Sequence, residues 1–476
     1  MKLRLLVPIV AAVLVLAWVL VAGSSASTTA DAWHPQEPRL PIVYVHGGAG
    51  SAAQYETQAM RWASNYYPNV VTGIDRTSSY SPVLNPMLDE FFDNVMAETG
   101  DDQIYVIAHS LGTSLMVNYL NSSPERSARV AKYINIDGAT GENCPGNPEP
   151  VDCMNIARNP ASIMGPINVH LTDHGHTQCV TSAQSFVAQY EFLTGKEPKT
   201  TLVVPEFPLL VKIAGKLINF PANTGVDGAT MEVWEVDGDT GARKYSSPKA
   251  VINIGPTGEW GPIRVNGQKH YEFAVMRPDS ENVAHYYRQP FLRDDYLIRL
   301  LSSEPDSPII TNTEVGPDHA AAVLIRYKEW WTDQETGNDT MWVTTDSPTW
   351  NNDPDNPSPP TLNILSNPAV GLRIAHKIGI HAHDARVADK VSTLNPIPYF
   401  VGQIFQTGVD IWMPATEPPD GTITFMSEPR GDTTRPQVVN VPNWASEDHR
   451  ISIQFNDYEQ DINTWWEYIL YLLFGD

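Results

Sequence analysis

The pattern of hydrophobic and polar positions changes near residue 200. Between residues 40 and 200, short β-branched and apolar runs alternate with longer segments in which apolar residues recur every three or four positions. The short runs predict strands and the longer segments predict helices. Strands that alternate with helices form parallel sheets, so we expect an α/β domain over residues 38–200, with a mainly parallel sheet and flanking helices.

Individual segments of this region are clear enough to place. The predicted strands are PIVYV, NVVTGI, DQIYVIA, VAKYINI and PINVHL. Helical spacing follows in residues 53–65, 84–100, 114–125 and 182–195. Thr181 or Ser182 is the expected N-cap of the last helix and Gly195 its end, because short polar residues start helices and glycine terminates them.

After residue 200, apolar and polar residues alternate in short runs separated by Gly, Asp and Pro. The alternation is clearest in ATMEVWEVD, where Met231 and Val233 point one way and Thr230 and Glu232 the other. We predict a C-terminal all-β region in two parts. The first is an all-β module over residues 207–302, which resembles β-sandwich modules of the transthyretin or carboxypeptidase-regulatory kind, and the second is a β-rich domain over residues 318–476.

Both ends of the chain are apolar. Lys2 and Arg4 precede the apolar run Leu5–Gly23, and small residues follow it. This pattern is typical of an export signal within residues 1–30, with an uncleaved anchor as the alternative. We therefore expect a secreted, periplasmic or cell-surface protein. At the other end, TWWEYILYLLFG is predicted to close a core, and the alternative is an interfacial anchor.

Composition narrows the range of partners. The 476 residues carry 31 Lys and Arg against 55 Asp and Glu, a net charge of −24, which excludes nucleic acid as a probable ligand class. The three cysteines form no CxxC pair, so a structural zinc site has no support. We expect no metal and no cofactor. Cys144 and Cys153 lie in a Gly/Pro-rich loop and could form a disulfide or remain two thiols. No pattern indicates an oligomeric state.

The most informative motif is Ala108-His109-Ser110-Leu111-Gly112, between a predicted strand and a predicted helix. It matches Gly-x-Ser-x-Gly with alanine in the first position. A serine on such a sharp turn needs small residues two positions before and after it, because the neighbouring strand and helix leave no room for a larger side chain. Ser110 is therefore the expected nucleophile.

A glycine-rich loop, His46-Gly47-Gly48-Ala49-Gly50, ends the first predicted strand. Backbone amides in such a loop can approach a ligand oxygen closely. We expect an oxyanion hole made by the amide of Gly48, or of Ala49 next to it, together with that of Leu111. His46 is expected to support this loop and not to react. A phosphate-binding loop is disfavoured, since no Gly-Lys-Ser/Thr or GxGxxG motif is present.

The general base should be a histidine late in the α/β domain. His170 lies within a predicted strand, where a structural role is expected. His174 and His176 flank Gly175 in the loop before the last helix, beyond the carboxyl end of a strand, where parallel sheets place their active sites. We predict His176 as the base, with His174 as the alternative.

The acid that orients this histidine should also follow a strand. Asp137 ends VAKYINID, and Asp173 ends INVHLTD only three positions before His176. A carboxylate so close in sequence could hardly reach the far imidazole nitrogen while the ring faces Ser110. We predict Asp137, with Asp173 as the alternative. The resulting order Ser, Asp, His is that of α/β-hydrolases.

Several segments resemble secreted bacterial and archaeal lipases of the α/β-hydrolase fold, in particular the Archaeoglobus type with a C-terminal β-domain. They are PIVYVHGGAGS, AHSLG, NIDG, DHGHTQCVTSAQSFVAQYEFLTG and, in the β-region, KLINFPANTGVDGATMEVWEVDGDTGAR. The resemblance covers roughly residues 38–300. It implies the roles given above for Ser110, Asp137, His176 and the loop around Gly48. It also implies hydrolysis of acylglycerols or similar hydrophobic esters through an acyl-enzyme, with transient contact to a lipid droplet or emulsion. The stretch between Asp137 and Ile167 is short for a long lid.

Two other functions compete with this one. An extracellular depolymerase for polyesters such as polyhydroxyalkanoate would keep the triad and use exposed aromatics on a polymer surface. Trp330, Trp331, Trp465 and Trp466 could supply them, although core packing is the preferred prediction for these tryptophans. The third hypothesis is an inactive hydrolase-fold protein that binds a surface. The complete set of triad residues argues against this hypothesis.

Overall fold

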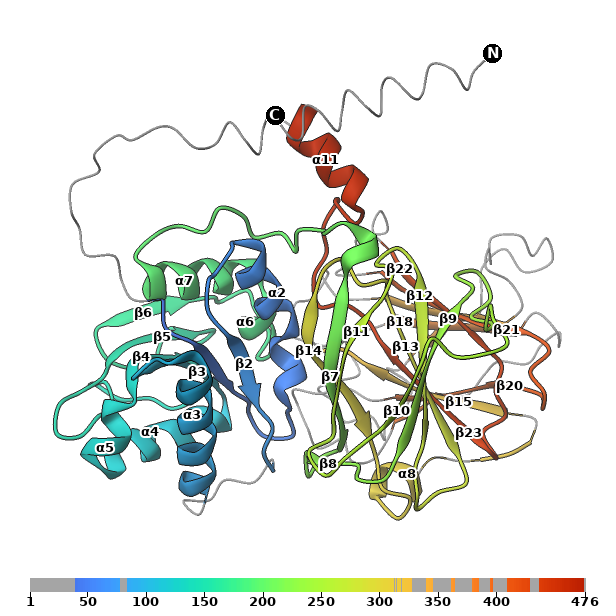
Figure 1. Cartoon of the computed structure of the whole chain (residues 1–476), viewed down its shortest axis with the longest axis horizontal. Helices are drawn as coiled ribbons and strands as arrows, with labels where there is room; N and C mark the ends of the chain where they lie inside the picture. The colour runs from blue at the N-terminus through green and yellow to red at the C-terminus, as the bar shows by residue number, and fades with distance from the viewer. Residues whose placement is uncertain are drawn as a thin grey trace. The chain divides into compact units, whose positions relative to one another are not determined.

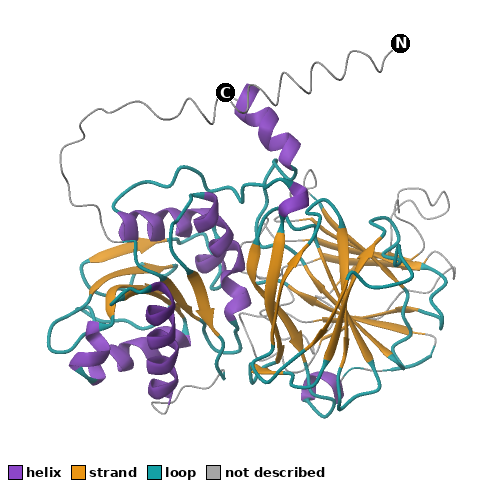
Figure 2. Ribbon diagram, viewed as in Figure 1, coloured by secondary structure: helices purple, strands orange, loops and turns teal. Residues whose placement is uncertain are grey.

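A computed structural model gives the fold of the chain (Figures 1 and 2). It describes residues 39–77, 84–311, 313, 315–317, 319–327, 340–345, 361–363, 379–384, 394–396, 409–428 and 436–474. The predicted export signal and two of the tryptophans, Trp330 and Trp331, lie outside the described residues.

The N-terminal part contains a parallel six-stranded sheet in the order β2-β1-β3-β4-β5-β6. Its strands are β1 Ile42–Val45, β2 Val71–Ile74, β3 Ile104–His109, β4 Val130–Ile136, β5 Asp152–Ala157 and β6 Ile167–His170. The helices are η1 Ala52–Tyr55, α2 Glu56–Ser64, α3 Asn85–Thr99, α4 Leu111–Ser122, α5 Pro124–Ala128, α6 Gln178–Thr181 and α7 Ala183–Thr194. The predicted α/β fold with flanking helices, followed by β-sheets, is confirmed.

Both faces of this sheet are covered, as the purple helices around the orange strands in Figure 2 illustrate. On one face, Trp62 of α2 and Phe186 of α7 pack with Tyr44 of β1. On the other face, Phe92 of α3 and Tyr119 of α4 pack in a separate core with further strand residues. Strands buried on both faces read as continuous apolar runs, which is why the sequence pattern was strong here.

The ends of these helices follow the sequence prediction closely. The side chain of Ser182 accepts a hydrogen bond from the Ser185 amide at 3.1 Å, and Gly195 ends α7 with a φ of 67°. Gly100 ends α3 in the same left-handed conformation. Strand β5 was not predicted. Its polar residues Asp152 and Asn155, next to a Gly/Pro-rich loop, interrupt the apolar pattern, although Asn155 is buried between asparagines of β4 and β6.

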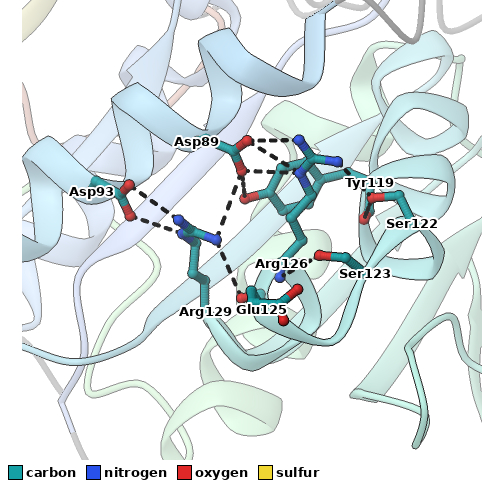
Figure 3. A network of polar contacts seen from close by, with 8 residues as sticks. All are labelled: Asp89, Asp93, Tyr119, Ser122, Ser123, Glu125, Arg126 and Arg129. Atoms are coloured by element: carbon teal, nitrogen blue, oxygen red, sulfur yellow. Dashed lines mark hydrogen bonds and ion pairs between the residues drawn. The ribbon is translucent and has the colours of Figure 1, made fainter.

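A network of ion pairs joins α3 to α4 and α5 (Figure 3). Arg126 donates to Asp89 at 2.8 Å, Arg129 donates to Asp93 at 2.8 Å, and Tyr119 donates to Asp89 at 2.8 Å. Partly exposed ion pairs of this kind contribute little stability one by one, roughly 0.2–1 kcal/mol each. Their main consequence is that α3 is held in a fixed orientation beside α4, the helix that follows Ser110.

The second half of the chain is built almost entirely from strands. They are β7 Lys212–Asn219, β8 Thr224–Gly225, β9 Thr230–Val236, β10 Ala250–Asn253, β11 Glu259–Arg264, β12 His270–Met276, β13 Val283–Arg288, β14 Asp295–Ser302, β15 His319–Ile325, β16 Thr340–Thr345, β17 Thr361–Asn363, β18 Gly379–Asp384, β19 Leu394–Pro396, β20 Val409–Pro414, β21 Thr422–Glu428, β22 Gln437–Pro442 and β23 His449–Gln454. The short helices η3 Pro208–Leu210 and α8 Pro308–Thr311 lie among them.

These strands form three sheets. Their orders are β10-β9-β12-β13-β23-β15-β20-β19, β11-β7-β14 with β8 paired to β7, and β17-β18-β16-β21-β22. In the first sheet, β13 pairs in parallel with β23, which pairs in parallel with β15. The hydrogen-bonded sheet therefore runs across the predicted boundary between residues 302 and 318.

The α/β part and the β-sheets share buried polar contacts within one compact unit, residues 39–476. Glu56 on α2 pairs with Arg288 of β13. Arg293 donates to the hydroxyl of Ser64 on α2 at 2.8 Å. Since these groups are buried and contact each other across the two parts, the β-region is part of the structural support of the α/β region.

The last helix, α11 Trp465–Phe474, corrects the sequence prediction at this end of the chain. The segment is helical, but none of its residues is buried, so the predicted closure of a core is wrong. Trp466 is more than half exposed, which also overturns the core-packing prediction for this tryptophan. Among the helices in the described residues, none has the length and apolar character needed to cross a membrane.

Candidate active site

Ser110 lies on a strained turn between the end of β3 and the start of α4. Its backbone has φ 52° and ψ −123°, a region that non-glycine residues rarely adopt. The turn is held by the Ser110 amide, which donates to the Ile136 carbonyl at 3.0 Å. A Cβ on Gly112 would lie 2.5 Å from the carbonyl oxygens of Val45 and His46, so only glycine fits there. This is the geometry that the motif predicted, and it presents the half-buried serine at the end of the sheet.

The glycine-rich loop after β1 runs directly beside this turn. A Cβ on Gly47 would lie 2.8 Å from the Cβ of Ser110, and a Cβ on Gly48 would lie 3.6 Å from Leu111 Cδ2. Ala49 adopts a positive φ of 51°. The loop that carries Gly48 and Ala49 and the amide of Leu111 are thus brought together at the serine, as an oxyanion hole requires.

Asp137 and His176 are in contact, although 39 positions separate them. His176 Nδ1 lies 2.5 Å from Asp137 Oδ2. Arg158 donates to the same carboxylate from its amide at 3.2 Å and from Nε at 3.0 Å. Burial acts to raise the pKa of Asp137, but the hydrogen bonds from His176 and Arg158 outweigh it, and the pKa lies below its usual value. Asp137 is therefore a charged acceptor that fixes the orientation of the His176 ring.

His109, the residue before Ser110, connects this pair to the serine turn. The rings of His109 and His176 lie 4.5 Å apart between centroids. The side-chain Nε2 of Gln54 donates to His109 Nδ1 at 2.9 Å, and His109 Nε2 donates to the backbone carbonyl of His176 at 3.1 Å. Burial and the proximity of His176 hold the pKa of His109 well below its usual value. A neutral His109 therefore packs the His176 segment against the turn.

His46 supports the glycine-rich loop, as the sequence suggested. Its Nδ1 donates to the Gly47 carbonyl at 2.7 Å, and its Nε2 accepts from the Arg76 amide at 3.2 Å. Burial, together with the charge of Arg76, lowers the pKa of His46 to about 3. A ring with both nitrogens engaged and so low a pKa is a poor general base.

The histidines and the aspartate that the sequence analysis considered besides His176 and Asp137 have different neighbours. His174 pairs with Asp173 at 2.7 Å, while the Asp173 side chain is 79% exposed. His170 is the exposed last residue of β6. The structure therefore joins Asp137 to His176 and joins Asp173 to His174, a separate pair.

The glycine-rich loop is also held by residues that the sequence analysis did not single out. Asn223, in the turn between β7 and β8, donates to the carbonyls of Gly50 at 2.7 Å and Arg76 at 2.8 Å. Asp75 accepts from the amide of Ala52 at 3.0 Å and from Arg299 of β14 at 2.8 Å. Asn223 and Arg299 lie more than a hundred residues after the groups they contact, so no local pattern could have revealed these contacts.

For the ester hydrolysis predicted from the sequence, we expect Asn223→Ala to lower kcat roughly tenfold with little change in KM, because small displacements of catalytic groups reduce rates strongly. Loss of its two hydrogen bonds would loosen the loop that carries Gly48 and Ala49. Steady-state kinetics on a soluble ester test this. Asn253→Ala is the control, because Asn253 is an exposed asparagine of β10. This variant should match the wild type. An unchanged kcat for Asn223→Ala would show that the loop is fixed by other contacts.

Cys144 and Cys153 are joined in a disulfide with an S–S distance of 2.04 Å and a Cα–Cα distance of 5.7 Å. A Cβ on Gly165 would lie 2.4 Å from the Cys144 sulfur, so the neighbouring chain is packed against this bridge. Cys179, on α6, is buried and is not part of this disulfide. The bridge links the loop before β5 to the strand itself, close to the segment that follows Asp137.

Comparison with known proteins relates one segment of the β-region to lipases. Residues 210–305 match the model of the lipase C-terminal domain. This part of the chain is lipase-like. A further model, of another C-terminal domain, matches residues 308–459. A search of curated proteins finds no match. Among solved structures, the crystal structure of the gene lin2722 product from Listeria innocua is similar, with 12% identity, 34% of this chain and 97% of that chain covered, and a TM-score of 0.27.

Proposed function

We propose that the chain is an exported serine carboxylester hydrolase of the lipase kind, acting on acylglycerols or similar hydrophobic esters. The observation that carries the proposal is the contact of His176 with Asp137 beside the strained turn of Ser110. The lipase-like residues 210–305 support the choice of substrate class.

In the proposed reaction, His176 takes the proton of the Ser110 hydroxyl through Nε2, while Asp137 holds Nδ1. The Ser110 oxygen attacks the ester carbonyl, and the oxyanion is bound by the amides of Leu111 and of Gly48 or Ala49. When the intermediate collapses, His176 donates its proton to the leaving alcohol. Water then attacks the acyl-enzyme with His176 again as base, which releases the acid and restores Ser110.

Two features of the site support an acyl-transfer mechanism. The charged Asp137 lies within hydrogen-bond reach of Nδ1 of His176 and would stabilise the imidazolium that forms when the ring accepts a proton. Because the Asp137 side chain is only 8% exposed, that charge acts through a medium less polarisable than water. His46 and His109 are held neutral and engaged by other groups, and His174 pairs with the exposed Asp173, which supports His176 as the base.

A substrate panel tests the proposal. We expect hydrolysis of p-nitrophenyl esters from acetate to palmitate and of tributyrin and triolein emulsions. Activity on a polyhydroxybutyrate film with weak cleavage of triolein would instead assign the chain to the polyester depolymerases. If the folded protein cleaves no ester and is not labelled by a serine-directed phosphonate, the proposal is wrong, and a surface-binding protein with an inactive hydrolase fold takes its place.

A further inference from the structure

Helix α11 exposes an unusual concentration of apolar side chains. Leu472 is 59% exposed and Phe474 77% exposed, and Leu470, Tyr471 and Leu473 are exposed with them. The helix contains a single charged residue, Glu467, in its first turn. Figure 1 shows α11 in red, extending away from the ends of the strands. Monomeric proteins rarely expose a contiguous apolar surface of this kind unless it contacts something.

The helix is fixed at its base. The Thr464 hydroxyl accepts from the Glu467 amide at 3.1 Å, and the Glu467 carboxylate accepts from the amides of Thr464 and Asn463 at 2.8 Å and 2.7 Å. This reciprocal arrangement is a capping box, which defines where the helix begins. The ring of Trp465 packs against Phe207 at 5.3 Å between centroids. The first turn is thus attached to the protein, and the rest of the helix extends from it.

The distribution of apolar residues around the helix indicates what covers it. Residues 470–474 are five consecutive exposed apolar residues, and successive residues are rotated by about 100°, so they surround the helix on every side. A partner helix or a flat protein surface covers only a stripe made by every third or fourth residue. A helix that is apolar all round needs a medium that surrounds it, and lipid is such a medium.

The order of residues along the axis fits a lipid interface. Tryptophan and tyrosine favour the boundary between water and lipid, while leucine and phenylalanine favour the hydrocarbon. Trp465, Trp466 and Tyr468 lie at the attached end, and Leu472, Leu473 and Phe474 lie at the far end. Ten residues extend about 15 Å, about half the thickness of a hydrocarbon core. The helix is long enough to enter one leaflet or the surface of a droplet.

Charge selects the kind of lipid. The chain has a net charge of −24, and residues 451–476 include five acidic residues and no Lys or Arg. Anionic lipids attract basic segments, so the acidic segment of residues 451–476 would be repelled by a negatively charged lipid surface. Next to the base of the helix, Leu209 and Leu210 of η3 are also exposed and extend the apolar surface beyond Phe207.

We propose that α11 inserts into an uncharged lipid surface and docks the protein there, with Leu472, Leu473 and Phe474 in the apolar phase and Trp466 at the boundary. Docking itself needs no catalysis. Its use, to bring the Ser110 site to an emulsified ester, rests on the proposed function.

Lipid binding is measured by flotation of the full chain with phosphatidylcholine vesicles, in a Ser110→Ala background that prevents turnover. Leu472→Asp should lower the partition coefficient at least tenfold, because it places a charge where the proposal buries a leucine side chain in the lipid. Val251→Asp is the matched control, since Val251 is an apolar residue of β10 that is 58% exposed and is also replaced by aspartate. It should bind like the parent. Addition of phosphatidylserine should weaken the binding of the parent.

Each other result overturns the inference. If Leu472→Asp binds as well as the parent, another segment makes the lipid contact, the apolar run of residues 5–23 included. If the parent sediments as a dimer without lipid and Leu472→Asp as a monomer, the helix pairs with a second copy. If phosphatidylserine strengthens binding, charge does not select the surface as argued.

Hydrolysis separates this inference from the proposed function. With Ser110 intact, Leu472→Asp should retain kcat/KM on a soluble short-chain ester and lose at least tenfold on a triolein emulsion. Vesicle binding without any ester hydrolysis would remove the proposed function and leave the docking helix. Equal emulsion activity in both proteins would remove the docking role and leave the hydrolase.

Discussion

Ser110→Ala should lower kcat for ester hydrolysis by about 10⁴-fold or more. The reason is that the covalent step requires an oxygen nucleophile at the turn between β3 and α4, and alanine offers none. The proposed oxyanion-hole amides, those of Leu111 and of Gly48 or Ala49, would still bind the carbonyl oxygen, so a small residual rate above that of water is expected. The measurement is initial velocity on p-nitrophenyl butyrate, together with labelling of the wild type by a serine-directed phosphonate.

The fold should survive this substitution. Alanine is the smallest change at a position with φ 52°, where any residue with a Cβ meets the same strain as serine. The melting temperature should therefore stay within a few degrees of the wild-type value. Residual activity above about 1% in a folded variant would place the nucleophile elsewhere.

The features that the sequence predicted well are those fixed by local chemistry. A serine turn needs small neighbours, and the steric reason is visible at Gly112, where a Cβ would meet backbone oxygens at 2.5 Å. The N-cap at Ser182 and the terminating Gly195 are local signals of the same kind. Asp137 could be chosen because parallel strands place their carboxyl ends at one edge of the sheet, so a residue after β4 lies near one after β3.

The features that the sequence did not predict depend on tertiary contacts. Asn223 and Arg299 read as ordinary polar positions of β-strands and turns, and only the fold brings Asn223 to the glycine-rich loop and Arg299 to Asp75. Strand β5 was missed because its asparagine is satisfied by neighbouring asparagines, not by water. For α11, an apolar segment favours burial, and hydrophobicity alone does not distinguish a protein core from a lipid phase.

Asp137→Asn should lower kcat by about 10⁴-fold, whereas Asp173→Asn should change it less than about twofold. An asparagine at 137 retains the side-chain shape but removes the charge, and its amide can favour the wrong tautomer of His176. Asparagine also tolerates the positive φ of 42° at this position, so the variant should fold. By contrast, the exposed Asp173 contacts His174 and not His176. The measurement is kcat and KM for both variants on the same ester. A large loss in Asp173→Asn with a nearly active Asp137→Asn would transfer the acid to Asp173, and it would mean that the loop containing His174 and His176 takes up another conformation when the enzyme acts.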